Sequence, residues 1–265
     1  VDIEEYLSFL TYYEKDGQIY QNHEEGKARK LATLNTFFGY FHKKEMIQKN
    51  APSVVDVPRV KEKNIIRLDA NEVAQLIDNI ESGEKLTKQQ KVWHDRNKAR
   101  DLAIVVTLLG TGVRVTELVG LDLSDLDFDN GAMRVIRKGG NEDIVYFGEE
   151  TEEMLRNYLD ERMKMTPAPG HENALFISQN NTRITVRSVE RLVKKYASTA
   201  TVKKITPHKL RSTYGTALYQ ETGDIYLVAD VLGHKNVNTT RKHYAAMKEE
   251  NKRKAANIVQ LREKE

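Results

Sequence analysis

Two histidine-containing segments and a tyrosine near the C-terminal end carry side chains suited to cutting a phosphodiester bond. The segments are Pro-His-Lys-Leu-Arg-Ser-Thr-Tyr at 207–214 and Leu-Gly-His-Lys at 232–235, and Thr-Thr-Arg-Lys-His-Tyr-Ala-Ala follows at 239–246. A phosphodiester can be cut without metal when cations hold the phosphate, a proton donor serves the leaving group and a hydroxyl attacks. These chemical types are supplied by His208, Arg211, His234 and Tyr244.

The spacing of His208 and Arg211 suggests that they act together. They stand three residues apart, so a helix would project both from one face. Pro207 is tolerated in a first helical turn, and Thr206 before it can cap the helix. The pair could therefore reach one phosphate, or both side chains could be solvated while Leu210 faces inward.

His234 follows Gly233, a residue type that commonly ends a helix and displays its neighbour just outside it. Such a histidine is either a structural hydrogen-bonding residue or a catalytic one. Tyr244 comes ten positions later. Most tyrosines are half-buried packing residues, so Tyr244 is notable only in the company of the other groups.

Two further cations precede these segments. Arg114 lies in Gly-Thr-Gly-Val-Arg-Val-Thr-Glu-Leu at 110–118, where Gly110 and Gly112 allow a tight backbone turn. It is either a surface arginine that pairs with Glu117, or a guanidinium that forks onto two phosphate oxygens. Lys138 lies in Arg-Lys-Gly-Gly-Asn, a predicted hairpin turn. It is either a solvent-exposed lysine that keeps the sheet edge soluble or a general acid for a leaving alkoxide.

The composition limits the class of protein. The chain has 265 residues, a formal net charge of +3 and 31% charged residues, a mildly basic balance that permits a nucleic-acid partner without requiring one. It has no cysteine, which excludes disulfides and thiolate metal sites. The most apolar stretch, 102–109, is too short to span a bilayer, and no signal peptide precedes it. We expect a cytoplasmic protein, and the initial valine suggests a piece of a longer chain.

The apolar spacing predicts two domains that are mainly α-helical. Residues 1–50 have the pattern of two helices of a small bundle, separated by a polar turn. Residues 51–64 contain two prolines and no helical period, which is typical of a linker. A second domain is expected over 65–265, with an Asp or Asn cap before a helix that runs through Ile80.

Within the second domain, two β-rich segments around Gly139 and Gly140 predict an antiparallel hairpin. The remaining pattern is helical, which gives a mainly α fold with a small antiparallel β-sheet. Helices are expected at 95–109, 115–120, 149–163, 185–197, 207–220, 225–232 and 247–262. Other chemistries lack their signatures, because the sequence contains no Gly-x-Gly-x-x-Gly motif, no P-loop, no zinc-type histidine pair and no compact acidic set.

Together, these motifs resemble those of the tyrosine recombinase family, the phage-type integrases and Xer-like proteins. The resemblance covers roughly 68–247 and rests on Thr-Gly-Val-Arg-Val-Thr-Glu-Leu, the lysine of Arg-Lys-Gly-Gly-Asn, His-Lys-Leu-Arg, Leu-Gly-His and a later tyrosine, in the family's order. The lysine-rich composition is most similar to that of conjugative-transposon integrases. The helical part before the linker resembles a core-binding domain truncated at its N-terminus, and the resemblance leaves room for an arm-binding domain before it in the whole protein.

The resemblance implies a mechanism and a set of partners. Tyr244 would attack a scissile phosphate, form a 3′-phosphotyrosyl link and expel a 5′-hydroxyl, without metal or nucleotide cofactor. Arg114 and Arg211 would stabilise the transition state, Lys138 would protonate the leaving oxygen, and His208 and His234 would position the phosphate and assist proton transfer. The partners would be double-stranded DNA with inverted-repeat core sites, bound by four protomers on two duplexes during integration or excision of a mobile element.

Other expectations concern DNA contact and assembly. Basic residues of the first domain are candidate DNA-binding residues: Lys27, Arg29, Lys30, Lys43 and Lys44. The apolar row of the 247–262 helix predicts docking on a neighbouring protomer, as in tails of the family. Many members have the tyrosine nine residues after the Leu-Gly-His histidine, whereas Tyr244 stands ten after His234. A type IB topoisomerase-like relaxase acting as a monomer, and a DNA-binding regulator without catalysis, remain alternatives.

Overall fold

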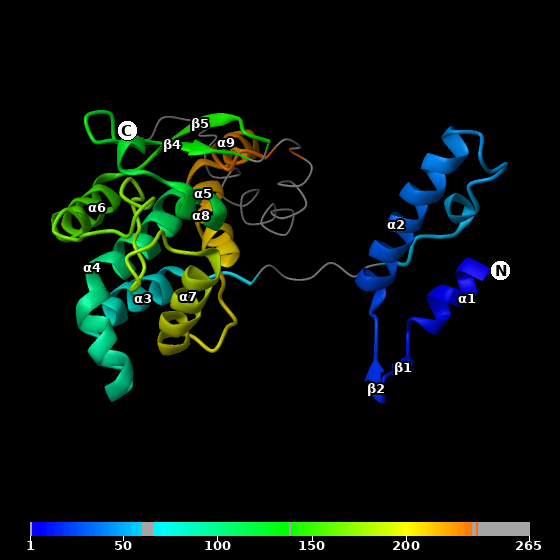
Figure 1. The fold of residues 1–265 in the computed structure, drawn as a ribbon, viewed down its shortest axis with the longest axis horizontal. Helices are drawn as coiled ribbons and strands as arrows, with labels where there is room; N and C mark the ends of the chain where they lie inside the picture. Colours follow the sequence, from blue (N-terminus) through cyan, green and yellow to red (C-terminus); the bar gives the residue numbers. More distant parts are fainter. Residues whose placement is uncertain (1, 60–65, 138, 235–236, 238–265) are drawn as a thin grey trace, which may run out of the picture. The chain divides into compact units, whose positions relative to one another are not determined.

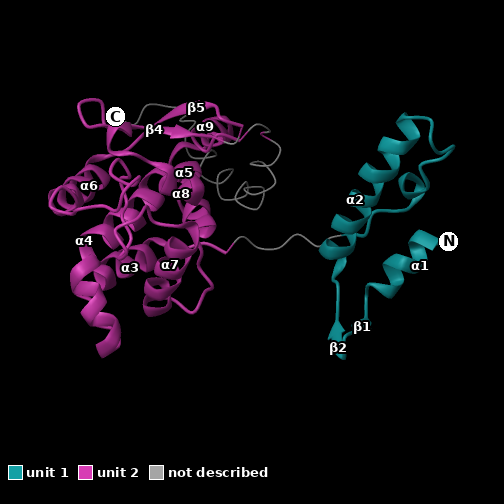
Figure 2. Cartoon of the chain, in the orientation of Figure 1, with its two compact units in different colours: residues 1–64 teal, residues 65–265 magenta. Residues whose placement is uncertain are grey.

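The computed structural model describes residues 2–59, 66–137, 139–234 and 237 (Figure 1). The chain falls into two units, residues 1–64 and 65–265 (Figure 2). Lys138, Tyr244 and the helix predicted at 247–262 lie outside the described residues. No helix in the described ranges is both long enough and apolar enough to cross a membrane.

The first unit contains two helices, as the apolar spacing predicts, and a hairpin that the spacing does not predict. Its elements are α1 (Asp2–Phe9), β1 (Tyr13–Lys15), β2 (Gln18–Tyr20), α2 (Glu24–Lys43) and the 3₁₀ turn η1 (Ala51–Val54). The polar turn expected between the helices is the hairpin β1–β2. Asp16 and Gly17 both have positive φ, of 53° and 70°, which is the conformation of the type I′ turn that Asp-Gly pairs favour.

The core of the first unit is small. Leu7 of α1 and Leu10 just after its end pack with Leu31 of α2, and Val55 packs against the same cluster. Pro52 in η1 is also buried. The first residues of the segment predicted as a linker are therefore folded onto this unit, because their apolar side chains complete its core.

The second unit is mainly helical, as predicted. Its helices are α3 (Ala70–Ser82), α4 (Lys88–Thr111), α5 (Val115–Gly120), α6 (Glu149–Arg162), α7 (Val186–Ala200), α8 (Pro207–Thr222) and α9 (Ile225–Val231), with the 3₁₀ turn η2 (Leu123–Asp125). The helix α4 is central and contacts α3, α6 and α8 (Figure 1). Its C-terminal half, from Leu102 to Leu108, is buried throughout, which explains why this stretch is apolar on every side.

The prediction that this central helix begins at residue 95 is wrong by seven residues. The helix starts at Lys88 because Thr87 accepts a hydrogen bond from the Gln90 backbone N–H, while the Gln90 side chain accepts one from the Thr87 N–H. This reciprocal capping box stabilises the first turn although the residues that follow are polar. The predicted cap of α3 is confirmed, since Asp69 forms the same box with Glu72.

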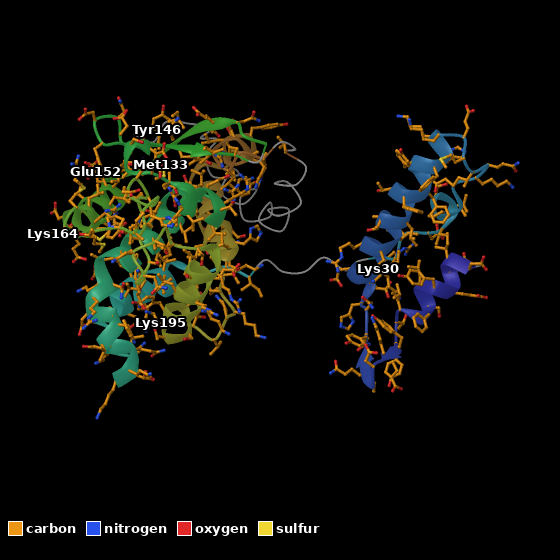
Figure 3. The ribbon with its side chains drawn as sticks, in the orientation of Figure 1. Lys30, Met133, Tyr146, Glu152, Lys164 and Lys195 are labelled. Carbon is orange, nitrogen blue, oxygen red and sulfur yellow. The ribbon has the colours of Figure 1, made fainter. Side chains whose placement is uncertain are left out.

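The small sheet has three strands where a two-stranded hairpin was expected. It consists of β3 (Leu126–Asp127), β4 (Ala132–Ile136) and β5 (Glu142–Tyr146), all antiparallel. One face packs inward: Met133 is fully buried, whereas Tyr146 on the other face is exposed, and both side chains are labelled in Figure 3. The turn between β4 and β5 is closed by a hydrogen bond of 2.7 Å from the Arg137 N–H to the Asn141 carbonyl.

The turn between α4 and α5 places Arg114. Gly112 ends α4 with φ 65°, and a Cβ there would meet the ring of Tyr214 at 2.4 Å. Gly112 thus serves both the left-handed turn and close packing against α8. Gly110, expected to take part in this turn, is still helical, and a Cβ on it would meet Thr151 Oγ1 at 2.4 Å. Its role is close packing of α4 on α6.

Candidate active site

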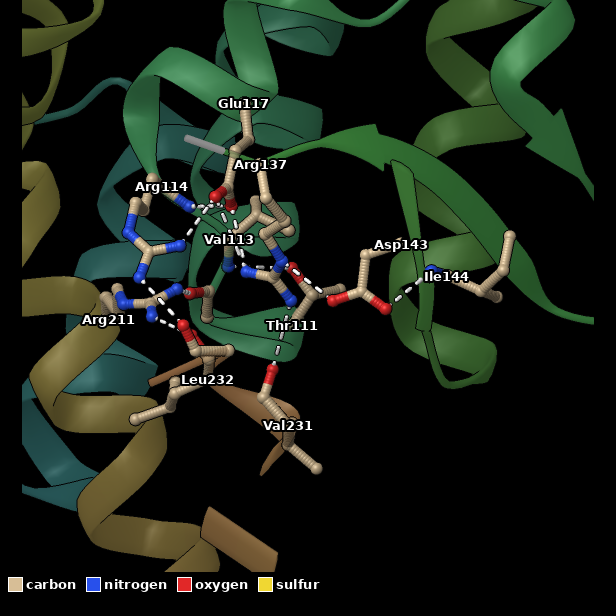
Figure 4. A network of polar contacts seen from close by, with 12 residues as sticks. Thr111, Val113, Arg114, Glu117, Arg137, Asp143, Ile144, Arg211, Val231 and Leu232 are labelled. Carbon is tan, nitrogen blue, oxygen red and sulfur yellow. Dashed lines mark hydrogen bonds and ion pairs between the residues drawn. The ribbon is translucent and has the colours of Figure 1, made fainter. Parts of the chain in front are cut away.

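Arg114 stands at the N-cap of α5 with its side chain directed at the end of α9 (Figure 4). Its Nη1 donates to Glu117 Oε1 at 2.7 Å, and its Nη2 donates to the Gly233 carbonyl at 3.2 Å. The predicted pairing with Glu117 is confirmed. The Arg114 side chain remains 35% exposed, so its guanidinium is held in orientation and still accessible from solvent.

Arg211 lies in the first half of α8 and is only 4% exposed. The interpretation that it is a solvated residue is therefore wrong. Its Nη1 donates to the carbonyl of Gly112, and its Nη2 donates to the carbonyl of Leu232 (Figure 4). Arg211 thereby joins the turn after α4 to the turn after α9.

The ends of two helices hold these guanidiniums. The last carbonyls of a helix have no partner within it and carry partial negative charge. At the end of α4 the Gly112 carbonyl receives Arg211, and at the end of α9 the Leu232 and Gly233 carbonyls receive Arg211 and Arg114. Cations from separate parts of the chain converge here because each satisfies a carbonyl group that would otherwise lack a partner.

Two residues of this network, Glu117 and Arg137, were not predicted as site residues. The Glu117 side chain is 2% exposed and accepts from the backbone N–H and the guanidinium of Arg114. Arg137 Nη1 lies 3.2 Å from Glu117 Oε2, and its Nε donates to Asp143 Oδ2 at 2.8 Å. The proximity of Glu117 to Arg114 in sequence predicts the first contact, but no local pattern indicates the second.

The described part of the cluster contains charges of both signs. The guanidiniums of Arg114 and Arg137 pair with the carboxylates of Glu117 and Asp143. Arg137 is flanked by both carboxylates, while Arg211 donates to two backbone carbonyls. The partly exposed guanidinium of Arg114 is suited to a phosphodiester, because arginine forks match the geometry of phosphate oxygens.

The two histidines are close in sequence to groups of this cluster: His208 precedes Arg211 by three residues, and His234 directly follows Gly233. His234 is half-buried directly after Gly233, and its N–H donates to the Ala229 carbonyl at 2.8 Å. Its display just outside the end of α9 agrees with the predicted helix end at Gly233, where φ is 58°. His208 is exposed in the first turn of α8, while Arg211 one turn later is buried. Lys138 and Tyr244 belong to the parts of the chain that the structure does not describe.

The basic residues suggested for DNA contact in the first unit differ in their surroundings. Lys27 forms an ion pair of 2.6 Å with Glu24 and is largely buried. Arg29, Lys43 and Lys44 are exposed, and Lys30 is half-buried on α2 (Figure 3). Lys27 therefore contributes to the structure of the unit, whereas the other four are accessible to a ligand.

A second buried polar cluster joins the N-terminal part of α4 to α7. Tyr196 Oη donates to Asp101 Oδ2 at 3.0 Å and lies 3.0 Å from His94 Nδ1. Because a carboxylate only accepts, the hydroxyl proton points to Asp101 and His94 Nδ1 carries hydrogen. Burial, followed by the charge of Lys195, lowers the pKa of His94. This cluster holds α4 against α7. It is separate from the arginine network at the C-terminal end of α4.

Comparisons with known proteins identify the family of this chain. The model of the phage integrase family matches residues 66–251. Tyrosine recombinase XerC of Corynebacterium glutamicum is 33% identical over 223 residues, which are 82% of this chain and 68% of that protein.

Solved structures share the fold. XerH site-specific recombinase bound to palindromic difH substrate has a TM-score of 0.72 at 21% identity, over 97% of this chain and 72% of that one. The Tn1549 transposon integrase in complex with circular intermediate DNA has a TM-score of 0.67 at 24% identity, over 92% and 80%. From the family match and the XerC relationship, the chain belongs to the phage integrase family and is a tyrosine recombinase, an enzyme that breaks and rejoins DNA.

Proposed function

We propose that this recombinase cleaves DNA through a 3′-phosphotyrosyl link to Tyr244 and that it integrates and excises a mobile element. The observation that carries the proposal is the convergence of Arg114 and Arg211 on consecutive carbonyls at the end of α9. His234 follows the second of these carbonyls directly. A phosphate bound by Arg114 would lie next to a histidine and a nearly buried second guanidinium.

The transition state of this reaction carries more negative charge on phosphorus oxygens than the bound DNA does. Arg114 and Arg211 are fixed before the reaction by Glu117 and by backbone carbonyls. Preorganised donors of this kind stabilise the transition state without reorganisation during the reaction. Removal of one such donor typically costs about 100- to 1000-fold in rate.

The covalent step is balanced without a metal. The Tyr244 oxygen forms a bond to phosphorus, and the bond from phosphorus to the 5′ oxygen breaks. Lys138 supplies the proton for the leaving 5′-hydroxyl, while His208 and His234 position the phosphate and assist removal of the tyrosine proton. Attack by a 5′-hydroxyl reverses the step, so the phosphotyrosyl link conserves the bond for rejoining.

The proposed DNA partner is a duplex with inverted-repeat core sites. Support comes from XerH, which was solved with a palindromic substrate. We assign residues 1–50, with the turn at Ala51–Val54 that folds onto them, to a core-binding domain. The rest of the segment 51–64 would be a linker, and 65–265 would be the catalytic domain. In the core-binding domain, Arg29, Lys30, Lys43 and Lys44 would contact phosphates. Four protomers would assemble on two duplexes through exchange of the 247–262 helix.

The nucleophile is tested with a nicked suicide duplex that carries a site selected from random DNA by the wild-type protein. The wild type should form an SDS-resistant protein–DNA adduct, and Tyr244→Phe should form none. His243→Ala provides a neighbouring control that keeps the tyrosine. An adduct that persists in Tyr244→Phe would refute the assigned nucleophile, and site-specific binding without any adduct in the wild type would favour a DNA-binding regulator.

A second candidate function is recombination at one palindromic chromosomal site, which the sequence identity to XerC favours. The fold similarity to Tn1549 integrase, solved on circular intermediate DNA, supports the mobile-element function. Trapped adducts in cells that carry the gene can be mapped by sequencing. Adducts at both ends of a segment that also occurs as a circle would support the element, whereas adducts at a single palindrome would support the second function. Relaxation of plasmids by a monomer without site preference would instead identify a topoisomerase-like relaxase.

A further inference from the structure

We infer that Arg137 is a positioning residue for DNA cleavage, which fixes Glu117 against Arg114 and ties the β4–β5 hairpin to the end of α9. The inference rests on the proposed role of Arg114 in the reaction. Arg137 directly follows β4 and is not among the six residues that the motifs indicate. It has no assigned role in the proposed chemistry, yet its guanidinium lies inside the network of polar contacts (Figure 4).

Its guanidinium contacts three separate elements. Nη1 lies 3.2 Å from Glu117 Oε2 on α5, Nε donates to Asp143 Oδ2 on β5 at 2.8 Å, and Nη2 donates to the Val231 carbonyl at the end of α9 at 3.4 Å. The side chain is only 11% exposed. A cation this enclosed has little access to DNA, and its effect must pass through the groups that it contacts.

The turn after α9 leaves room for this guanidinium. Gly233 has φ 58°, and a Cβ built on it would lie 2.7 Å from Arg137 Cζ and 3.0 Å from Nε and Nη1. Any other residue at position 233 would have to displace Arg137. The Gly233 carbonyl also accepts from Arg114, so Arg137 packs against the residue that orients the predicted phosphate ligand.

Glu117 connects the two arginines. Its carboxylate is shared by Arg114 and Arg137, and Asp143 balances the charge of Arg137. Without Arg137, Glu117 would face a single cation and could rotate about its side-chain bonds. Arg114 would follow it, because one of its guanidinium contacts is to that carboxylate. A displacement of about 1 Å at a catalytic group can cost about 100-fold in rate.

The test compares full-chain Arg137→Ala and Arg137→Lys with the control Arg134→Ala. Arg134 lies on β4, three residues before Arg137, and also binds two carboxylates, of Asp125 and Glu142. It is 45% exposed, and neither of its ion pairs involves Glu117. Each variant is assayed for single-turnover cleavage of the nicked duplex and for affinity toward the uncleaved duplex. We expect about 10- to 100-fold slower cleavage for Arg137→Ala with affinity within about threefold. Arg137→Lys should recover part of the rate, and Arg134→Ala should stay within about threefold of the wild type.

A double-mutant cycle separates positioning from general stabilisation. If Arg137 acts through Glu117, then Arg137→Ala combined with Glu117→Gln should cleave about as slowly as Glu117→Gln alone. Multiplied defects would overturn the inference. The inference would also be overturned if Arg137→Ala slowed cleavage no more than Arg134→Ala does, or if its slower cleavage came with an equal loss of DNA affinity.

Hydrogen exchange gives a readout that needs no cleavage. Exchange of the amides in 229–234 should accelerate in Arg137→Ala and in Arg137→Lys, and should not change in Arg134→Ala. Unchanged exchange in both Arg137 variants would overturn the inference. Should the wild-type protein form no adduct, the proposed nucleophile has failed, and the exchange comparison still decides whether Arg137 holds the end of α9.

Discussion

Arg114 and Arg211 bind consecutive backbone carbonyls: Arg211 donates to Leu232 and Arg114 donates to Gly233. The turn that ends α9 therefore sets the spacing between two guanidiniums that come from α5 and α8. Arg211 also binds Gly112 at the end of α4. Both arginines hold neighbouring groups, but only Arg211 is buried. Substitution of the two arginines should therefore affect the stability of the fold differently.

Arg114→Lys and Arg211→Lys should both slow DNA cleavage, but only the second should strongly destabilise the fold. Lysine keeps the charge and loses the planar fork, so we expect about 100-fold slower single-turnover cleavage for each variant. In Arg211→Lys one carbonyl, of Gly112 or Leu232, also loses its partner. An unsatisfied buried acceptor costs about 1–3 kcal/mol, or about 2–4 °C of melting temperature per kcal/mol in a domain of this size.

Thermal unfolding and cleavage of the nicked duplex check this pair. Arg191→Lys serves as the control, because Arg191 is an exposed arginine on α7. Equal losses of melting temperature for Arg114→Lys and Arg211→Lys would contradict the structural difference between the two sites.

Gly112→Ala should be more destabilising than Gly223→Ala. Both glycines end a helix with nearly the same positive φ, 65° and 66°, but only at Gly112 does an added Cβ meet another side chain, the Tyr214 ring. The left-handed conformation alone costs a non-glycine residue about 1–2 kcal/mol. Gly223→Ala measures that cost. Gly112→Ala also displaces Tyr214, and overpacking of this kind typically lowers the free energy of unfolding by a further ~1–3 kcal/mol.

Urea unfolding of the two variants isolates the steric part as the difference between them. Gly112→Ala should also slow cleavage, since the Gly112 carbonyl holds Arg211. If the two variants unfolded at the same urea concentration, the close approach of Tyr214 to Gly112 would have no energetic consequence.

Local patterns in the sequence predicted the helices well and the individual site arginines in part. Arg114 follows a glycine turn and Arg211 stands one turn after His208, so their positions can be inferred from short-range spacing. The burial of Arg211 could not be inferred, because the carbonyls that replace its solvent belong to Gly112 and Leu232. The Asp16–Gly17 pair and the Thr87–Gln90 capping box are short local signals in the sequence. The strands beside the first are only three residues long, and the residues after the second are polar, so neither signal is joined to a clear apolar pattern.

The contacts of Arg137 could not be predicted from the sequence. It stands beside Lys138, the residue that the motif indicates, and its partners Glu117, Asp143 and Val231 lie on three other elements. Nothing in the spacing of residues along one strand encodes a contact to the end of α9. Tertiary packing alone brings the hairpin, α5 and α9 together.

His94 should make the stability of the second unit depend on pH. Burial and then the charge of Lys195 lower the pKa of this histidine below its ordinary value of 6.5. The folded state therefore favours the neutral ring, and its contribution to stability is present above about pH 6.5 and is lost as pH falls below that value. The neutral ring donates from Nδ1 to the Tyr196 hydroxyl.

His94→Asn checks this dependence, because the asparagine amide nitrogen takes the place of Nδ1 and does not titrate. The melting temperature of the wild type should fall more steeply than that of His94→Asn between pH 7 and pH 5. Parallel curves for the wild type and His94→Asn would show that the ring does not titrate in this range.

Glu72 should also stabilise the first helix of the second unit in a pH-dependent way, over a lower pH range than His94. Burial opposes its ionisation, but hydrogen bonds from Lys203, Thr201 and the Asp69 N–H prevail and lower its pKa from 4.5 to about 2. The contacts are 2.5 Å to Lys203 Nζ, 2.7 Å to Thr201 Oγ1 and 2.9 Å to the Asp69 nitrogen. They join the start of α3 to the segment between α7 and α8.

Because the folded pKa lies below the unfolded one, the contribution of Glu72 is complete above about pH 4.5 and is lost as pH falls toward 2. Glu72→Gln should therefore unfold at a lower urea concentration than the wild type at pH 7, and the gap should narrow between pH 5 and pH 3. Glu84→Gln, at an exposed position in the turn after α3, should show no such gap. A difference between the wild type and Glu72→Gln that stays constant over this range would mean that the carboxylate charge does not stabilise the junction, and that the hydrogen-bonding shape of the side chain alone does.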